Sequence, residues 1–463
     1  MVGAPLYVWS RHGVPAQDPI VESSDSAAVV SPPPQRHRLG LGMVWILVSN
    51  GVYALSQWLV IILVARLVDA EAVGQYGLAL AVTAPIMLLG TLRMRSAIVT
   101  DMKGQFRLST YLRVGLSTSL AALLAVCLLT AVIARDLSAA LTIVLVGGAK
   151  AADNVSELFY GVLQRDERLG GIAALVTLNG TLTLVVAWLG LRLSPLALTV
   201  AAGSAGSSAL VAVASAALAA PSGAGTPYQR LRPTLRAFVL RCAGPKVAMK
   251  QPSWSLVKTV LPLTAVTVLA SLSVNLPRYF VDAQLGEAAL GVYTALSYLA
   301  IVGSLAINAV GQAVTPRLAR YHASGAGGAF MHLLRQAVVA GTAIGMTLVA
   351  VTVLWGEDIL TALYGSGYAA HQPLLVLLAL GSAVMYAQVF VGTGVTAMRD
   401  FRSQWPVSAA GAAAVLALSA VLVPAMGMSG AALAVLGGAI VQATLSVLVL
   451  IPLLRRRSRC TVS

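Results

Sequence analysis

Residues Leu137 to Arg168 read LSAALTIVLVGGAKAADNVSELFYGVLQRDER, and this stretch carries the strongest structural signal in the chain. Its first thirteen residues contain no charge, and as a helix with about 1.5 Å of rise per residue they cover roughly 20 Å. The hydrocarbon core of a bilayer is about 30 Å thick. A helix that crosses a membrane here must therefore continue through Lys150, Asp153, Asn154 and Glu157 before it reaches an aqueous turn.

The composition indicates that the chain does cross a membrane. It has 463 residues, of which 58% are hydrophobic and 10% charged, with a mean hydropathy of +0.84. Soluble domains contain about 25% charged residues. The net charge of +15 does not point to nucleic acid, because most of the positive charge lies in short loops between apolar segments, as the positive-inside rule predicts.

At about 100° per residue, the polar residues of the opening stretch share one face of a helix. They are Lys150, Asp153, Asn154, Glu157, Gly161 and Gln164. A polar face at bilayer depth must contact a partner helix or a wet cavity. We interpret it as one wall of a transport cavity. The alternatives are a structural ion pair between helices and an interfacial helix. One lysine facing two carboxylates favours the cavity, since a structural triad would be better balanced.

Hydropathy predicts an all-α, polytopic membrane protein with about twelve transmembrane helices in two six-helix lobes. The predicted spans are 43–65, 74–99, 114–134, 137–163, 170–191, 195–219, 257–280, 287–316, 336–355, 373–398, 405–423 and 429–453. With the N-terminus in the cytoplasm, 26 of the 31 Lys and Arg residues lie in inside segments, Lys150 lies within its helix, and only Arg66, Arg135, Arg192 and Arg278 lie outside. This asymmetry predicts that both termini are cytoplasmic.

Composition divides the chain into five parts. We expect a disordered cytoplasmic tail at 1–40, lobes at 41–220 and 257–454, a basic cytoplasmic linker at 221–256 and a basic tail at 455–463. The lobes also share a short motif. The turn after the first span contains Arg66, Asp69-Ala and Gly74-Gln-Tyr, and the turn after the seventh contains Arg278, Asp282-Ala and Gly291-Val-Tyr. Six spans per half predict a parallel repeat about an axis along the membrane normal.

Further polar residues within or beside the spans are candidates for the cavity. Arg93 and Arg95 are about 200° apart on a helix, so we expect only one of them to face a cleft and to bind a phosphate. Asn50 and Gln57 share a face and are candidates for the cavity or for interhelical hydrogen bonds. Arg278 either faces the cavity or pairs with Asp282 one turn later.

Nothing in the sequence indicates an enzyme. No Ser/His/Asp set, metal-ligand cluster, phosphate loop or dinucleotide fingerprint occurs at usable spacing, and the five histidines lie in the tail or in loops. No outside loop is long enough for an extramembrane catalytic domain. We therefore expect no cofactor beyond a proton or sodium ion used for coupling.

From about Met43 to Leu454 the chain resembles bacterial lipid-linked oligosaccharide flippases, also called O-antigen or polysaccharide transporters, whose superfamily includes multidrug and toxin extruders. The resemblance rests on motifs in order along the chain: Ala84-Pro85, Leu92-Arg-Met-Arg95, Phe159-Tyr-Gly161, Gln164-Arg-Asp-Glu167, Asn275-Leu-Pro-Arg-Tyr279, Gly311-Gln312, Leu363-Tyr-Gly-Ser-Gly-Tyr368 and Met398-Arg-Asp-Phe401. It implies two six-helix lobes in a V around a cationic cavity. The substrate would be a glycan on polyprenyl pyrophosphate, moved from the cytoplasmic to the outer leaflet of the bacterial inner membrane.

The resulting hypothesis is an alternating-access flippase for polysaccharide or lipopolysaccharide biosynthesis. The substrate-binding candidates are Arg95, Lys150, Arg278, Arg93, Asn50 and Asn154, and the ion-coupling candidates are Asp153 and Glu157. The expected partners are the lipid-linked oligosaccharide, membrane lipid, and the glycan polymerase and glycosyltransferases of the same process, with no nucleic acid. The alternatives are a multidrug extruder, a membrane glycan polymerase or ligase, and a non-transporting scaffold.

Overall fold

The computed structural model describes residues 36–101, 106, 108–219, 253–301, 303–398 and 403–460. The first half contains α1 (Arg36–Leu67), α2 (Ala70–Thr91), α3 (Met94–Thr100), α4 (Leu108–Ile133), α5 (Leu137–Arg165), α6 (Leu169–Leu193) and α7 (Ala197–Ala219). The second half contains α9 (Ser253–Ile301), α10 (Ser304–Ala323), α11 (Gly327–Tyr364), the 3-10 turn η1 (Ser366–His371), α12 (Gln372–Ala397) and α13 (Gln404–Cys460). Most of the tail expected at 1–40 and of the linker expected at 221–256 lies outside these residues.

The prediction of an all-α membrane protein is confirmed. Eight helices in the described part of the chain are long and apolar enough to cross a membrane. α5 is not among them, since its second half carries the polar stripe. α9 and α13 each contain a residue outside helical geometry, Gly286 and Gly427, and so consist of two segments. If α2 and α3 count as one segment, and the second part of α9 and α10 as another, each described half contains six helical segments.

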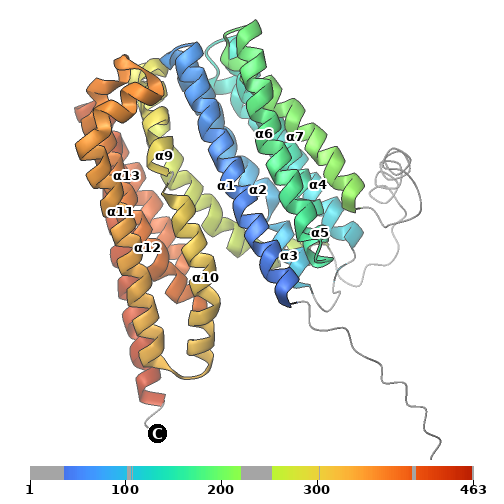
Figure 1. The fold of residues 1–463 in the computed structure, drawn as a ribbon, viewed down its shortest axis with the longest axis vertical. Helices are drawn as coiled ribbons and strands as arrows, with labels where there is room; N and C mark the ends of the chain where they lie inside the picture. Colours follow the sequence, from blue (N-terminus) through green and yellow to red (C-terminus); the bar gives the residue numbers. More distant parts are fainter. Residues whose placement is uncertain are drawn as a thin grey trace, which may run out of the picture.

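The two halves form two lobes. In the N-lobe (α1–α7), α1 packs on α6, and α5 packs on α2, α4 and α7; in the C-lobe (α9–α13), α9 and α12 pack on α13, and α11 packs on α12. Figure 1 shows the lobes converging at one end and diverging toward the end where the chain terminates. The most extensive contact between any two helices joins the lobes, between α2 and α9.

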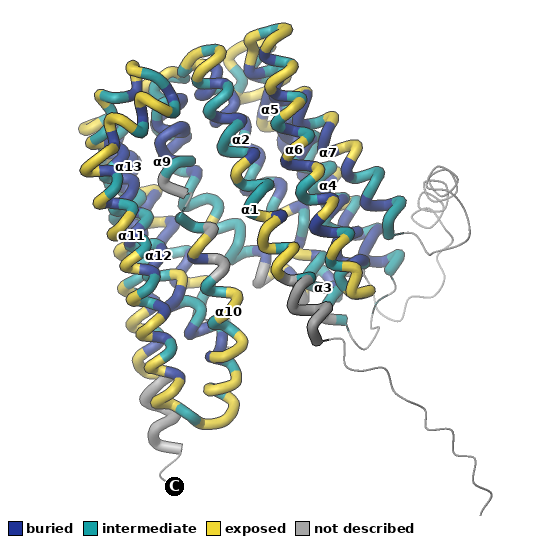
Figure 2. The backbone as a smooth tube through the Cα atoms, viewed as in Figure 1, coloured by how far each residue is buried: buried dark blue, intermediate teal, exposed yellow. Residues whose placement is uncertain are grey.

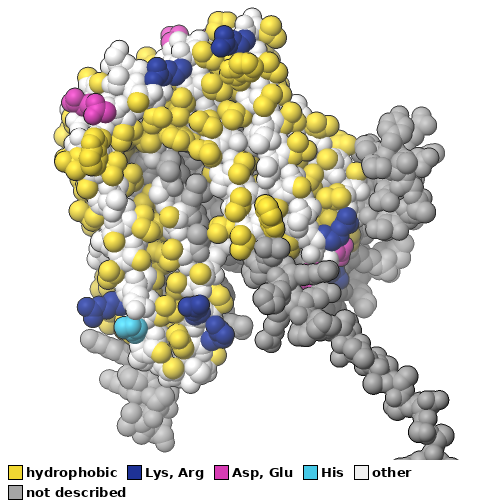
Figure 3. All heavy atoms as spheres, viewed as in Figure 1, with side chains coloured by type: hydrophobic (Ala, Val, Ile, Leu, Met, Phe, Trp, Pro, Cys, Tyr) yellow, Lys and Arg dark blue, Asp and Glu magenta, His cyan; other side chains and the backbone are white. Residues whose placement is uncertain are grey.

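The surface has the polarity expected of a protein in a bilayer. Exposed residues lie on the outer faces of the helices in Figure 2 and include many large apolar side chains, among them Leu120, Leu124, Leu128 and Val132 on α4. On the face shown in Figure 3, the charged side chains of the described part lie toward the two ends, with apolar and uncharged side chains between them. Contact with lipid accounts for this pattern. Lipid tails are as apolar as these side chains, so burying the side chains inside the protein would bring no hydrophobic gain.

The repeated motifs pack against each other where the lobes converge. A Cβ on Gly74 would collide with the carbonyl oxygen of Glu287, and one on Gly291 would collide with the carbonyl oxygen of Ala70. The tyrosines that follow, Tyr76 and Tyr293, are 2% and 1% exposed. Two backbones approach this closely only where the side chain is absent. The repeated Gly-x-Tyr motif therefore lies at the crossing of α2 and α9.

Two predicted spans differ from the structure. The span expected at 74–99 is interrupted between α2 and α3, where Leu92 and Arg93 adopt left-handed backbone angles with φ of 44° and 49°. The span expected at 287–316 is interrupted between Ile301 and Ser304. Helix breaks usually occur at proline or glycine, and only the second break has such a residue, Gly303.

Alanine at position 291 should force α2 and α9 apart, because overpacking of this kind costs about 1–3 kcal/mol. We expect Gly291→Ala to favour a state in which this end of the lobes is separated. Spin labels placed on the two lobes at this end should report a longer distance by double electron–electron resonance. Gly206→Ala is the matched control, since its Cβ meets nothing within 4 Å. An unchanged distance in Gly291→Ala would refute the role of this crossing.

Candidate functional site

The polar stripe of α5 lines a cavity within the N-lobe. α5 is continuous from Leu137 to Arg165 and begins at Asp136, whose side chain accepts a hydrogen bond from the Ala139 amide at 2.7 Å. The prediction that one helix continues through its charged residues is thereby confirmed. We call the cavity, which has a volume of about 500 Å³, the N-lobe pocket. Its polar lining consists of Asn50, Tyr53, Thr91, Arg93, Arg95, Ser96, Lys150, Asp153, Asn154, Ser156, Glu157, Tyr160 and Asn179.

Each carboxylate of the stripe has a cation beside it. Lys150 Nζ lies 3.5 Å from Asp153 Oδ2 within α5, and Arg95 Nη1 of α3 lies 3.2 Å from Glu157 Oε2. Arg95 Nε also donates to Gln164 Oε1 at 2.9 Å, and its guanidinium lies 5.7 Å from the centre of the Tyr160 ring. The charge imbalance inferred from α5 alone is therefore compensated by a neighbouring helix.

The break between α2 and α3 explains how both arginines reach one pocket. The expectation that only one of Arg93 and Arg95 faces the cleft is wrong, because it assumed an unbroken helix, and both line the N-lobe pocket. Gly161 of α5 allows the approach, since a Cβ there would lie 3.2 Å from the Cα of Arg95. The left-handed pair Leu92-Arg93 contains no glycine or proline that would have signalled the break.

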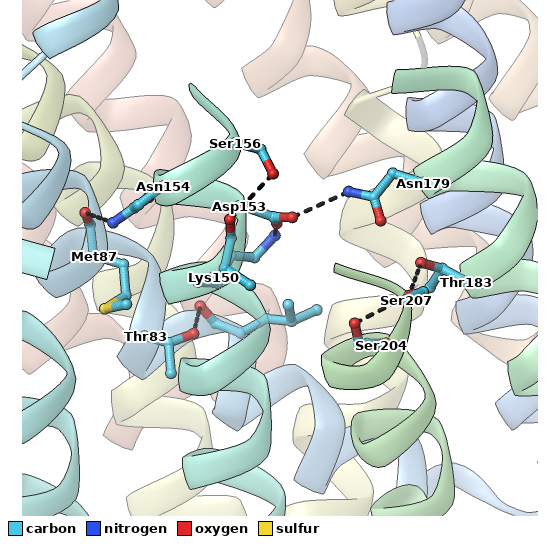
Figure 4. A network of polar contacts seen from close by, with 12 residues as sticks. Thr83, Met87, Lys150, Asp153, Asn154, Ser156, Asn179, Thr183, Ser204 and Ser207 are labelled. Atoms are coloured by element: carbon cyan, nitrogen blue, oxygen red, sulfur yellow. Dashed lines mark hydrogen bonds and ion pairs between the residues drawn. The ribbon is translucent and has the colours of Figure 1, made fainter. Parts of the chain in front are cut away.

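Sequence reasoning missed a set of buried polar residues next to Asp153. Asn179 of α6 donates to Asp153 Oδ1 at 3.0 Å, and Thr183 and Ser207 share a hydrogen bond of 2.7 Å between α6 and α7 (Figure 4). The candidate Asn154 is buried and donates to the carbonyl of Met87 at 3.1 Å, which ties α5 to α2. An asparagine in the middle of an apolar span was the available signal for Asn179.

A second cavity of about 410 Å³ lies between the lobes, and we call it the central pocket. The N-lobe contributes Tyr53, Gln57, Trp58 and Lys150, while the C-lobe contributes Asn275, Arg278, Tyr298 and Ser304, among other residues. Lys150 and Tyr53 line both cavities and therefore form the wall between them.

Arg278 is the principal cation of the C-lobe in the central pocket. It is 4% exposed, its Nη1 donates to Asn275 Oδ1 at 3.2 Å, and its guanidinium lies 5.5 Å from the centre of the Tyr298 ring. Its Nε is buried without a hydrogen-bond partner, and the described residues that line this cavity include no Asp or Glu. A buried cation with an unsatisfied donor is costly unless an anion binds it.

Asp282, the alternative partner of Arg278, pairs with Arg135 of the N-lobe instead. Arg135 lies 3.1 Å from Asp282 Oδ2 and 3.4 Å from Glu287 Oε1 at the end where the lobes converge. Asp282 lies in α9 beyond the predicted span 257–280 and before Gly286, where α9 divides. Burial raises the pKa of its carboxyl, and the Arg135 guanidinium opposes that rise. Asp282 therefore takes up a proton at a higher pH than an ordinary aspartate, and acid weakens this inter-lobe pair.

Hydrogen bonds to uncharged acceptors close the same end. Arg66 donates to the carbonyls of Thr361, Ala362 and Leu363 at the end of α11. Trp58 donates to the Tyr364 hydroxyl at 3.1 Å. The lobes are thus held together at one end by ion pairs and hydrogen bonds. The central pocket lies between the two lobes.

The backbone angles at Arg93 give a direct test of the α2–α3 break. A left-handed residue with a side chain costs roughly 1–2 kcal/mol relative to glycine. Because Arg93→Gly and Arg93→Ala both remove the exposed side chain, their difference reports the backbone alone. We expect purified Arg93→Gly to melt at a higher temperature than Arg93→Ala. Equal melting temperatures, or a lower one for the glycine variant, would mean that the backbone is helical here.

Comparison with known proteins assigns the chain to a family. The family model described as polysaccharide biosynthesis protein matches residues 39–322. The chain is similar to the capsular polysaccharide biosynthesis protein CapF of Staphylococcus aureus, with 25% identity over 412 residues that cover 84% of this chain and 94% of that protein.

Two solved structures share the fold. One is an inward-facing multidrug resistance transporter of the MATE family, of the MOP superfamily, with a TM-score of 0.67 and 13% identity over 88% of this chain and 96% of that one. The other is the lipid II flippase MurJ in an inward closed conformation, with a TM-score of 0.62 and 12% identity over 89% of this chain and 87% of that one. At these identities the likeness concerns the fold, and it confirms the expected two-lobe architecture.

Proposed function

The chain belongs to the family of polysaccharide biosynthesis proteins, and we propose on this premise that it transports a glycan linked to polyprenyl diphosphate from the cytoplasmic to the outer leaflet. The observation that carries the proposal is Arg278, a buried cation that lines a cavity between two lobes without a carboxylate partner among the described residues. A diphosphate group supplies the anion that this site lacks, and the guanidinium fork matches phosphate oxygens.

The orientation of the lobes supports loading from the cytoplasm. The lobes diverge at the end that carries the last residues of the chain (Figure 1), and the charge distribution predicts that this end is cytoplasmic. The contacts of Arg135 and Arg66 then close the outer end. The lipid tail would remain in the bilayer while the polar head enters between the lobes, so that its charge avoids the hydrocarbon.

The ion pairs refine the roles expected for the candidate residues. Arg95 and Lys150 each have a carboxylate beside them, whereas Arg278 has none among the described residues, so Arg278 is the first anchor for the diphosphate. Asp153 is the coupling residue, because a proton or sodium ion that neutralises it releases Lys150 toward the central pocket. An ion that neutralises Asp153 leaves the charge of Lys150 uncompensated, and an anionic substrate compensates that charge. Binding of the ion and binding of the substrate would therefore favour each other.

Substitution of Arg278 tests the anchor. We expect Arg278→Gln to keep its normal level in the membrane, because it removes a buried charge, and to reduce transport at least about a hundredfold, as for loss of a charge-assisted contact with its desolvation penalty. Transport is measured in proteoliposomes as exposure of a labelled polyprenyl diphosphate disaccharide to an external enzyme. Arg192→Gln, an exposed arginine over Trp188, is the control. Normal glycolipid transport by Arg278→Gln, or dye efflux without glycolipid transport by the wild type, would overturn the proposal.

Neutralisation of Asp153 tests coupling. Asp153→Asn mimics the ion-bound form, so we expect transport that no longer responds to an imposed proton or sodium gradient but still runs down the substrate gradient. Asp166→Asn, at the exposed end of the same helix, is the control and should keep the response. A gradient response that survives in Asp153→Asn assigns coupling elsewhere. Glu157→Gln separates the remaining alternative, since a purely structural pair predicts less protein with unchanged turnover per molecule.

A further inference from the structure

The two pockets differ in the state of their charges. In the central pocket, the described lining contains Lys150 and Arg278 and no carboxylate. In the N-lobe pocket, the lining contains Arg93, Arg95 and Lys150 together with Asp153 and Glu157, and two of these cations lie within 3.5 Å of a carboxylate. The third cation of the N-lobe pocket, Arg93, is exposed. An anionic group is therefore favoured in the central pocket, and a neutral polar group is favoured beside the two ion pairs of the N-lobe pocket.

The Arg95–Glu157 pair is preformed and still open to the cavity. Arg95 Nη1 contacts Glu157 Oε1 at 3.3 Å and Oε2 at 3.2 Å, while Nε is held by Gln164 and the ring of Tyr160 lies against the guanidinium. The side chains of Arg95 and Glu157 nevertheless remain 27% and 43% exposed. An ion pair this exposed adds only about 0–1 kcal/mol to stability, so it contributes little to the packing of α3 on α5, and its polar atoms remain accessible to a ligand in the cavity.

Such a pair has the hydrogen-bonding properties that sugar hydroxyls require. A hydroxyl both donates and accepts, a carboxylate only accepts, and a guanidinium only donates. Adjacent hydroxyls of one sugar ring can therefore donate to Glu157 and accept from Arg95 at the same time. Asn50, which is exposed in the same pocket, adds an amide that does both.

We propose that the N-lobe pocket binds the uncharged sugar units of the substrate through Arg95, Glu157 and Asn50, while the diphosphate is held separately at Arg278 in the central pocket. Lys150 and Tyr53, which line both cavities, stand where the sugar meets the phosphate. This inference rests on the proposed function and adds to it a second binding site with its own chemistry. Glu157 then acts in substrate recognition, and coupling is left to Asp153.

The proposal has a consequence that a structural pair would not have. Removal of the Glu157 charge leaves Arg95 as an unpaired cation in the N-lobe pocket, so the pocket should lose affinity for sugar and gain affinity for anions. Removal of both charges should abolish the sugar contribution without creating the anion site.

The experiment measures binding of two probes to the purified full chain in nanodiscs. The probes are farnesyl diphosphate and the same lipid diphosphate carrying a neutral disaccharide of N-acetylglucosamine. We expect the wild type to bind the glycosylated probe about tenfold more tightly, as one or two charge-assisted hydrogen bonds provide. Glu157→Gln should lose this preference and bind the bare diphosphate at least as tightly as the wild type. Arg95→Gln/Glu157→Gln should lose the preference with no gain for the bare probe.

Controls distinguish failure of this inference from failure of the proposed function. Arg278→Gln should weaken both probes by the same factor, and Glu357→Gln, an exposed residue of α11 that lines neither pocket, should change neither. If the wild type binds both probes equally while Arg278→Gln weakens both, the sugar site is wrong and the anion anchor stands. If Arg278→Gln has no effect, the anchor is wrong whatever the sugar preference. If Glu157→Gln weakens both probes equally and lowers the melting temperature, the pair is structural and the inference is refuted.

Discussion

The charges that this chain carries inside its lobes constrain its structure more than any other feature. A charged group in hydrocarbon is stable only when it is paired, hydrogen-bonded or in contact with water. Lys150 and Asp153 meet this requirement within α5, and Glu157 meets it through Arg95 of α3. The position of α3, which follows the left-handed break at Leu92 and Arg93, brings this cation to Glu157. Arg278 is the exception, since its only hydrogen bond among the described residues is to an amide oxygen.

The arrangement of paired and unpaired charges is linked to how the lobes meet. The glycine crossing of α2 and α9 and the contacts of Arg135 join the lobes at one end. Arg95, Lys150, Asp153 and Glu157 all belong to the N-lobe, so their pairs do not depend on contacts with the C-lobe. Arg278 belongs to the C-lobe and faces Lys150 across the central pocket. A movement of the lobes therefore changes the surroundings of Arg278 far more than those of the N-lobe pairs.

The sequence predicted the features that depend on local pattern. The length of the uncharged run before Lys150 predicted that one helix continues through its charged residues, and hydropathy predicted a polytopic all-α fold. The repeated Gly-x-Tyr, used as a sign of a repeat, lies where the two halves pack against each other. The features that it did not predict depend on residues far apart in the chain. Arg95 and Glu157 are separated by 62 positions, Asn179 and Asp153 by 26, and Arg135 and Asp282 by 147. The break before α3 was missed because the left-handed residues Leu92 and Arg93 include no glycine or proline, where helix breaks usually occur.

A ligand that reaches both pockets would contact both lobes at once and so link them. Each cation of the N-lobe pairs already has a carboxylate beside it. A neutral group bound there therefore adds hydrogen bonds and leaves the net charge unchanged. Arg278 is not satisfied, so an anion bound there removes an electrostatic cost that the empty C-lobe bears. Because the wall between the pockets is made of Lys150 and Tyr53, a substrate with a neutral part and an anionic part gains both interactions only when it contacts the two lobes together. In the proposed alternating-access cycle, this binding energy would be available for bringing the open ends of the lobes toward each other.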